Sequence, residues 1–219
     1  MKLLTAFVAS VFTITFVSAV SAETVSLIDK KKRWLDTEAN NSMTVDSSLY
    51  DFASPKNPRV LKTVSELVNI HSHYNGPKSR KWKNYTYTGK MRIDDPDGGV
   101  GVTVYSKYNR TDKYYRLRRY SGEPTFHFAP HGTTCTSGDV DTGVNPDAGV
   151  WYNFEVKAQT FSSRTKVFAK VWREGTSKPG SWMARCIDDS STRSKKGRAG
   201  VWSMANGKKR WGALRVRLP

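Results

Sequence analysis

The feature of this sequence that most constrains its fold is a series of short runs in which apolar and polar residues alternate. The runs begin after Trp82, and clusters of Gly, Pro, Asn or Asp separate them. Alternation with a period of two places successive side chains on opposite faces of a β-strand. Many short strands with turn residues between them are typical of a sandwich or a barrel. Because no long amphipathic helix pattern intervenes, we predict an all-β fold, a two-sheet antiparallel β-sandwich.

One parity of the alternation is apolar and predicts the core. A sandwich buries the inner faces of its two sheets, so these side chains should point between them. Upstream, residues 58–74 fit either a helical stripe or short strands, and their β-branched content favours strands. The predicted core residues are Val100, Val102, Val104, Phe126, Phe128, Tyr152, Phe154, Val156, Val167, Ala169, Val171, Leu214, Val216 and Leu218.

The opposite parity, predicted to point outward, carries cations interleaved with aromatic side chains, and in the last run it comprises Trp211, Arg215 and Arg217. An aromatic ring can stack on the C–H face of a sugar, and arginine pairs in bidentate fashion with a carboxylate or sulfate. We therefore predict one exposed face that binds an acidic polysaccharide; an outer face covered by a loop or by other strands is the alternative. The predicted ligand-binding residues are Tyr114, Arg116, Arg118, Tyr120, His127, Lys166, Phe168, Lys170 and Trp172.

The first 22 residues have the pattern of a secretory signal peptide. Lys2 precedes a long apolar run that ends in small residues, and polar Glu23 follows the predicted cleavage site. A membrane anchor is the alternative, since the run approaches the minimum spanning length. We expect a secreted protein, periplasmic or extracellular, without membrane insertion after cleavage. Beyond the signal peptide (residues 1–22) we predict a polar arm (23–45) and one domain (46–219), and we expect a monomer.

The charge of the chain indicates an acidic partner. The formal net charge is +17, which suits an anionic polysaccharide, a nucleic acid or an anionic membrane surface. Lysine and arginine contacts to phosphates, with aromatic rings among them, would also suit nucleic-acid binding. Predicted export argues against a physiological nucleic-acid partner and favours the polysaccharide.

The chain has two cysteines, Cys135 and Cys186, and export would place them where disulfides persist. We therefore predict a disulfide between them, which would contribute about 3–4 kcal/mol by the loop-entropy relation. Two unrelated thiols are the alternative. A zinc site is not expected, because neither cysteine has a close Cys or His neighbour at zinc spacing.

The C-terminal half resembles a known superfamily. The segments WYNFEVKA, TKVFAKVWREGTSKPGSW, GRAGVWS and WGALRVRL are similar to the concanavalin A-like lectin/glucanase superfamily, and most to its laminin-G-like and secreted glucanase-like members. The resemblance spans Val45 to Pro219 and implies a jelly roll of two antiparallel sheets, with carbohydrate on the concave face or its rim. The residues that carry it are Gly149, Trp151, Tyr152, Lys170, Trp172, Gly175, Pro179, Trp182, Gly197, Gly200, Leu214 and Val216.

Two departures from the family pattern bear on activity. Members with glucanase activity carry a Glu-x-Asp-x-x-Glu strand, whose carboxylates act as nucleophile and acid. No glutamate here has an aspartate at that spacing, so retaining hydrolysis is not expected. Many relatives also hold calcium through an aspartate in the last strand, where this chain has Gly212.

Calcium has a second candidate site in the loop DDPDGG. Asp94 and Asp97 supply oxygen atoms of the kind that Ca²⁺ prefers, although Asp, Pro and Gly also simply form turns. A similar candidate is the loop SGDVDTGVNPD. We expect no required cofactor and keep calcium as an optional ligand.

Polysaccharide lysis is the alternative function. A lyase that cleaves a uronate by β-elimination needs a cation for the carboxylate, a base for the C5 proton and an acid for the leaving oxygen. His71, Tyr114, Arg116 and His127 are the candidate catalytic residues. The sequence therefore predicts a carbohydrate-binding jelly-roll protein. The alternatives are such a lyase and a non-catalytic interaction module of the cell envelope.

Overall fold

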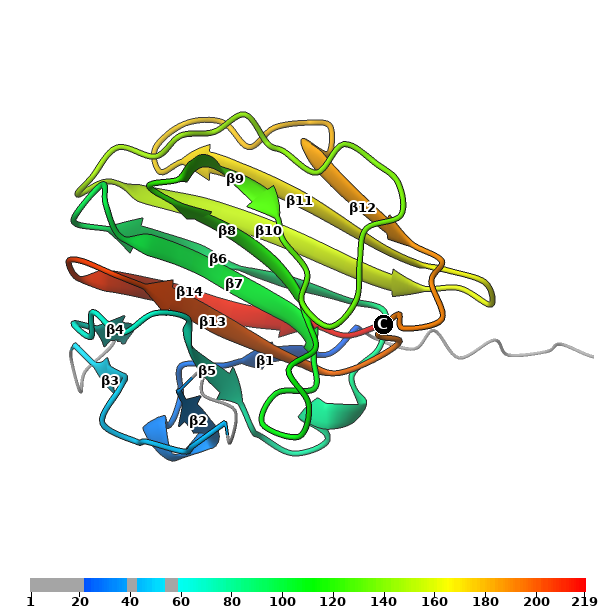
Figure 1. Ribbon diagram of the computed structural model, residues 1–219, viewed down its shortest axis with the longest axis horizontal. Helices are drawn as coiled ribbons and strands as arrows, with labels where there is room; N and C mark the ends of the chain where they lie inside the picture. The colour runs from blue at the N-terminus through cyan, green and yellow to red at the C-terminus, as the bar shows by residue number, and fades with distance from the viewer. Residues whose placement is uncertain (1–21, 39–42, 54–58) are drawn as a thin grey trace, which may run out of the picture.

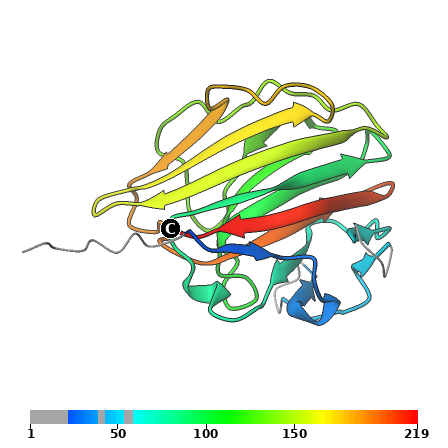
Figure 2. The same cartoon turned by 180° about the vertical axis from the view of Figure 1, so that it is seen from behind.

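The computed structural model describes residues 22–38, 43–53 and 59–219, which form a sandwich of two antiparallel sheets (Figures 1 and 2). The all-β prediction is confirmed. The predicted signal peptide falls, but for its last residue, outside the described residues and stays a prediction. Among the described residues, no helix has the length and apolar composition that crossing a bilayer requires.

The eight-stranded sheet faces the viewer in Figure 2, and the six-stranded sheet faces the viewer in Figure 1. The first has the order β12 (Ala184–Asp188), β11 (Thr165–Arg173), β10 (Trp151–Thr160), β6 (Tyr85–Ile93), β14 (Lys209–Arg217), β4 (Val60–Thr63) and β3 (Asp51–Phe52), and β1 (Thr24–Ser26) also pairs with β14. The second has the order β2 (Trp34–Thr37), β5 (Ile70–Tyr74), β13 (Arg198–Met204), β7 (Gly99–Ser106), β8 (Tyr115–Tyr120) and β9 (Glu123–Phe128). Two 3-10 helices, η1 (Lys31–Arg33) and η2 (Ser79–Lys81), lie in connections.

The core lies between the sheets and contains the residues predicted from the alternation. All fourteen belong to it or pack against it, and Leu218 alone among them is half-buried. The ambiguous upstream segment forms the strands β4 and β5, as predicted. The period of two therefore predicted the inward faces of both sheets correctly.

Trp211 is an exception to the predicted parity. Its alternation with Arg215 and Arg217 predicted an outward side chain, but the ring is fully buried and its Nε1 donates to the carbonyl of Gly101 at 3.0 Å. The pairing of β14 with β6 shifts register between Gly212 and Arg215. One extra residue in a bulge reverses the parity that follows it, so Trp211 and Leu214 both face the core.

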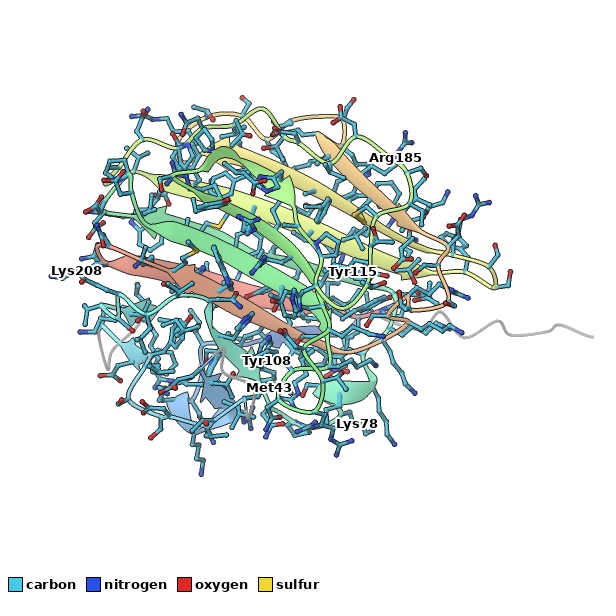
Figure 3. All side chains as sticks on the ribbon, in the orientation of Figure 1. Met43, Lys78, Tyr108, Tyr115, Arg185 and Lys208 are labelled. Atoms are coloured by element: carbon cyan, nitrogen blue, oxygen red, sulfur yellow. A yellow bond between two sulfur atoms is a disulfide. The ribbon has the colours of Figure 1, made fainter. Side chains whose placement is uncertain are left out.

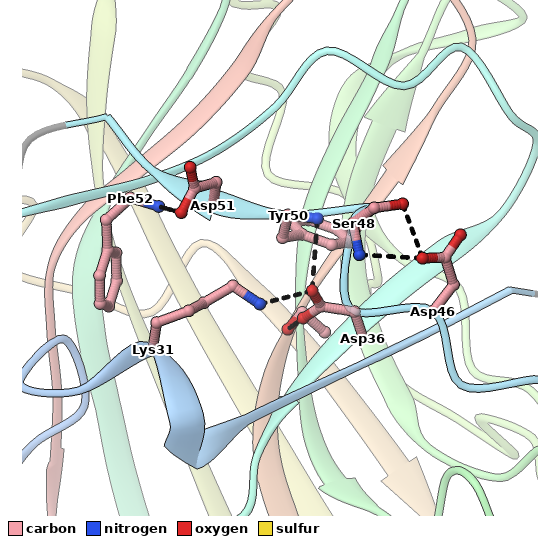
Figure 4. Close-up of polar contacts among 8 residues, drawn as sticks. Lys31, Asp36, Asp46, Ser48, Tyr50, Asp51 and Phe52 are labelled. Carbon is pink, nitrogen blue, oxygen red and sulfur yellow. Dashed lines mark hydrogen bonds and ion pairs between the residues drawn. The ribbon is translucent and has the colours of Figure 1, made fainter.

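The prediction of a loosely attached polar arm over residues 23–45 does not fit the described part of this segment, which contributes a strand to each sheet. β1 pairs with β14, and β2 pairs with β5. Asp36 of β2 is buried, where it accepts from Lys31 Nζ at 2.6 Å, from the Tyr50 backbone N–H at 3.3 Å and from the Ser72 hydroxyl (Figure 4). A buried carboxylate with three donors fixes this segment against the domain. The segment is too short and polar for its strands to show a clear period.

The predicted disulfide between Cys135 and Cys186 is present. It joins the long β9–β10 connection (residues 129–150) to β12, at the edge of the eight-stranded sheet. Cys186 is buried in the core and Cys135 packs against it. The disulfide therefore anchors a long connection to the sandwich.

Candidate functional site

The predicted ligand-binding residues do not form one face. Arg116 and Arg118 lie on β8 of the six-stranded sheet, whereas Lys170 and Trp172 lie on β11 of the eight-stranded sheet. Both sets point away from the core, so they lie on opposite sides of the sandwich. The prediction of a single continuous surface is wrong, because the alternation tells inward from outward side chains but not which sheet a strand joins.

On the six-stranded sheet, side chains far apart in the sequence meet in one row. Arg118 of β8 pairs in register with Gly101 of β7, and Gly101 with Trp202 of β13. His127 of β9 lies opposite Arg118, and His71 of β5 lies opposite Trp202. The row thus crosses five strands on the outer face of this sheet.

Arginines and aromatic rings alternate along this face. We call the set Tyr114, Arg116, Trp202, Arg118 and Tyr120 the arginine–aromatic ladder. The Arg116 guanidinium lies 4.5 Å from the Trp202 ring centre and 5.5 Å from that of Tyr114. The Arg118 guanidinium lies 4.5 Å from the Tyr120 ring and 5.7 Å from that of Trp202. Such cation–π contacts hold each guanidinium against an aromatic ring.

Trp202 and Asn69 complete the ladder and were not among the predicted residues. Asn69 Oδ1 accepts from Trp202 Nε1 at 2.5 Å and from Arg116 Nη1 at 2.9 Å. A Cβ on Gly99 would lie 2.9 Å from the Trp202 ring, so glycine lets the indole lie flat over β7. The parity of GRAGVWSM, with Ala199 and Val201 in the core, was the available signal for an outward Trp202.

The two ends of the ladder differ in exposure. Tyr114 is fully buried and Arg116 is 8% exposed, and burial lowers the pKa of Arg116 to about 10. At the other end, Arg118 and Tyr120 are half-buried. Arg118 Nη2 lies 2.7 Å from the carboxylate of Glu123, an exposed residue. The Arg118–Tyr120 end is therefore the more exposed end of the ladder.

His127 belongs to the accessible end of the ladder. Its Nδ1 donates to the Thr125 carbonyl at 2.8 Å, and its Nε2 lies 3.0 Å from the Glu123 carboxylate. Glu123 is thus shared by Arg118 and His127. The Glu123 carboxylate therefore pairs with Arg118 within the protein.

The other histidine candidate lies in a buried cluster. His71 and His73 are almost fully buried, and the His71 ring stacks on Tyr108 at 4.3 Å and lies 5.0 Å from Tyr114. Burial holds the pKa of both histidines well below the ordinary value, and it raises the pKa of Tyr114. The structure thus brings His71, Tyr114 and Arg116 together beneath the surface. The fourth candidate, His127, lies beyond Arg118 and is half-buried.

On the eight-stranded sheet, the predicted residues are held by a neighbouring loop. Lys170 is 7% exposed, and its Nζ donates to the carbonyls of Pro179 and Gly180, each at 2.7 Å. The Phe168 ring lies 5.5 Å from that of Trp182, and Lys170 lies over Trp182 at 5.0 Å. These contacts satisfy Lys170 within the protein. Lys166 and Trp172 are half-buried neighbours on the same strand.

The same side of the molecule also carries a hollow of about 890 Å³. Trp151 and Lys90 line it, with the Lys90 ammonium 4.9 Å from the indole, and Arg215 lies on the β14 side. The hollow lies beside the bulge of β14 at Ala213. It is an aromatic and basic surface on the side of the sandwich opposite the arginine–aromatic ladder.

The calcium candidates do not fit the ion. The Asp94 carboxylate is paired with Arg92 at 2.7 Å and with Arg210 at 2.5 Å. Near Gly212, the closest side chains are those of Lys90 and Trp151, which offer no oxygen ligands. Within the described ranges, no group of three or more His, Cys, Asp or Glu residues could hold a metal ion. The calcium prediction at Asp94 and Asp97 therefore has no supporting geometry.

Comparisons with known proteins locate the fold. No protein-family model matches the sequence, and no curated protein matches it. Among solved structures, a Bacillus subtilis protein with a galectin-like fold is similar with a TM-score of 0.58 and 13% identity, covering 91% of this chain and 97% of its own. Lectin II from Ulex europaeus has a TM-score of 0.52 and 8% identity, with 90% and 97% covered. The carbohydrate-binding module CBM66 of Bacillus subtilis has a TM-score of 0.50 and 10% identity, with 84% and 94% covered.

These similarities define the class of the protein. Two antiparallel sheets, matched over nearly the whole length of a galectin-like structure and a legume lectin, show that this chain shares the two-sheet sandwich fold of those structures. The predicted resemblance is confirmed for the fold. At these identities the activity follows from the site and not from the fold.

Proposed function

We propose that this protein binds an acidic polysaccharide on the outer face of its six-stranded sheet, at the Arg118–Tyr120 end of the arginine–aromatic ladder. The observation that carries the proposal is the geometry of Arg118. Its guanidinium lies over the Tyr120 ring and pairs with the Glu123 carboxylate at the protein surface. A cation oriented by a ring and already holding a carboxylate is suited to a uronate or sulfate group.

The chemistry of binding follows from this arrangement. A sugar ring stacks on Tyr120, and its acidic substituent replaces Glu123 as the partner of Arg118. His127, 3.0 Å from the same Glu123 oxygen, supplies a second polar contact. The net charge of +17 attracts a polyanion to the whole protein. The lectin and the carbohydrate-binding module of the same fold support the carbohydrate part of the proposal.

The lyase alternative has weaker support. Its base and acid would be His71 and Tyr114, whose side chains have no exposed surface. Burial raises the pKa of Tyr114, which makes its phenol a weaker acid for the leaving oxygen, and it lowers the pKa of His71, which makes that imidazole a weaker base. Binding without bond cleavage is therefore the function that we propose. Export of the protein is part of the same proposal, since the polysaccharide would lie outside the cell.

Binding of polygalacturonate, with neutral dextran as the comparison polymer, tests the proposal by isothermal titration calorimetry. Tyr120→Ala and Arg118→Lys should each weaken polygalacturonate binding about tenfold or more, because each loses a stacking or charge-assisted contact. Glu123→Gln should strengthen it, because the competing internal charge is removed. Unchanged stability in urea controls for folding.

Trp151→Ala is the matched control, since it removes an aromatic ring from the opposite side of the sandwich. It should leave polygalacturonate binding unchanged. Loss of binding in Trp151→Ala together with normal binding in Tyr120→Ala would overturn the proposed face. Failure of the unmodified protein to bind any of a broad set of glycans would favour the interaction module of the cell envelope instead.

A further inference from the structure

A second feature of the structure is a basic pocket at one end of the sandwich. It has a volume of about 790 Å³, and nine of its twelve lining residues are lysines or arginines. The other three are Ser106, Thr111 and Ser194. No acidic residue is among these lining residues of the described chain. We call this set the basic pocket.

The basic pocket is assembled by elements distant in sequence. η2 contributes Arg80 and Lys81, and the β7–β8 connection contributes Lys107, Arg110 and Lys113. The remaining cations come from the β12–β13 connection and the start of β13. Three separate connections thus bring like charges into one space, although the electrostatic repulsion between these cations would be smaller if their side chains pointed into solvent.

Arg198 lies in the pocket wall and lacks a carboxylate partner. It is 1% exposed, and its Nε and Nη1 have no hydrogen-bond partner. Its Nη2 lies 3.4 Å from Asn109 Oδ1, a long contact. Burial, followed by repulsion from Arg80 and Arg110, lowers the pKa of Arg198 to about 10. A buried guanidinium without an anion is costly, and a bound anion would offset that cost.

Several cations elsewhere in the described chain are paired with carboxylates, whereas the cations of the basic pocket take part in none of these ion pairs. Lys31 pairs with Asp36, Lys90 with Glu174, and Lys178 with Glu155. In the basic pocket, by contrast, Lys113 donates to the carbonyl of Thr192, and Arg193 donates to the carbonyls of Phe161 and Ser162. Carbonyl oxygens orient these side chains without neutralising them. The positive potential of the pocket is therefore left for a ligand.

We propose that the basic pocket binds the sulfate or carboxylate groups of an acidic polysaccharide. Nine cations around one space exceed what a single small oxyanion neutralises, so a chain that carries several anionic groups fits better than a free ion. The inference rests on the proposed function, because it extends the same ligand to a second subsite.

The position of the basic pocket suits that extension. Lys113 of the pocket immediately precedes Tyr114, the first residue of the arginine–aromatic ladder. From Lys113 to Tyr120 the strand spans about 23 Å at the usual rise per residue. One polysaccharide chain that follows β8 would therefore meet the accessible end of the ladder and the basic pocket in succession.

Two double variants with the same loss of charge test the proposal. Arg110→Ala with Lys196→Ala removes exposed cations of the basic pocket. Arg185→Ala with Lys208→Ala removes one exposed arginine and one exposed lysine elsewhere, and Figure 3 labels both of these control residues. Dextran sulfate is the probe, unmodified dextran is the neutral comparison, and calorimetry measures the dissociation constants.

The pocket double variant should bind dextran sulfate about tenfold or more weaker than the control double variant, because it loses charge-assisted contacts. Equal losses in both double variants would overturn the proposal, since general charge would then explain binding. Tighter binding of a single-stranded oligonucleotide than of dextran sulfate, lost in the pocket variant, would overturn the polysaccharide as its ligand.

A thermal measurement separates the pocket from the proposed function. Sodium sulfate should raise the melting temperature above that in sodium chloride of equal ionic strength, because an anion bound to the native state stabilises it. The rise should be smaller in the pocket double variant than in the control double variant, because only the general stabilisation by sulfate remains there, while Tyr120→Ala should keep the full rise. Equal rises in the two double variants would overturn the pocket. Normal polygalacturonate binding by Tyr120→Ala, with the sulfate response intact, would instead contradict the ladder alone.

Discussion

Acidification from pH 7 to pH 5 should destabilise this protein through two buried histidines. His71 and His73 are 0% and 1% exposed, and burial is the main cause that holds the pKa of each well below its ordinary value. Arg116, His131 and His73 itself lower the pKa of His71 further, and Arg198 lowers that of His73. Both rings are therefore neutral in the folded protein at neutral pH.

The sign of the effect follows from the lowered pKa values. The unfolded chain takes up a proton at each histidine near pH 6.5, whereas the folded chain does not, so the unfolded state binds more protons below that pH. The contribution of the neutral histidines to the free energy of unfolding is thus complete above about pH 6.5 and falls as the pH decreases. At pH 5, each histidine should cost about 2 kcal/mol relative to pH 7, or about 4 kcal/mol together.

Asp36 acts in the opposite direction. Burial raises the pKa of this carboxyl, so the folded protein takes up its proton at a higher pH than the unfolded chain. Protonation of Asp36 therefore offsets part of the loss as the pH falls. This offset grows as the pH falls through the raised pKa of Asp36 in the folded protein, so the net loss is smaller than the contribution of the two histidines alone.

Urea denaturation followed by tryptophan fluorescence at pH 7 and pH 5 measures the effect. His71→Phe keeps a ring against Tyr108 but cannot titrate, so it should reduce the pH-dependent loss by about half, or about 2 kcal/mol. Ile70→Val, on the same strand and on the core side, should cost about 0.5–1.5 kcal/mol at both pH values alike. Equal stability of the unmodified protein at pH 7 and pH 5, or an unchanged loss in His71→Phe, would refute the reasoning.

Three further predictions concern stability. Replacement of Cys135 and Cys186 by alanine opens a loop with a sequence separation of 51 and should lower the free energy of unfolding by about 4 kcal/mol in denaturant titrations. Trp202→Ala should cost about 3–5 kcal/mol, because the indole is 1% exposed; a cost below 1 kcal/mol would contradict its packing beneath the arginines. Gly200→Ala places a Cβ 2.4 Å from a histidine ring atom and should cost about 1–3 kcal/mol. Gly180→Ala, which meets nothing within 4 Å, should melt at nearly the unmodified temperature.

The strands and the core could be read from local patterns. Val100, Val102 and Val104 alternate with glycine and threonine, and this alternation indicates directly which side chains are buried in the core. The outward direction predicted for Trp211 was wrong because the bulge in β14 adds one residue to the strand, and no cluster of turn residues interrupts the sequence there. Similarly, the strand of Trp34–Thr37 has four residues, too few to establish a period.

The candidate site could be predicted only in part. The outward parity of Arg116, Arg118 and Tyr120 was correct, and it located one half of the arginine–aromatic ladder. Trp202 reaches the same face from a strand more than eighty positions further on, through the pairing of β13 with β7. The basic pocket needs three loops at once, and none of its segments is unusual by itself.

By itself, the sequence determined the fold class, the inward faces of the strands and the pair of cysteines, because these depend on neighbours a few residues apart or on composition. The tertiary structure alone decided that Arg118 and Lys170 lie on opposite sides of the sandwich, and that Lys170 is occupied by backbone carbonyls. The physical reason is that period-two geometry distinguishes two faces of one strand, whereas the order of strands in a sheet is set by long-range backbone pairing.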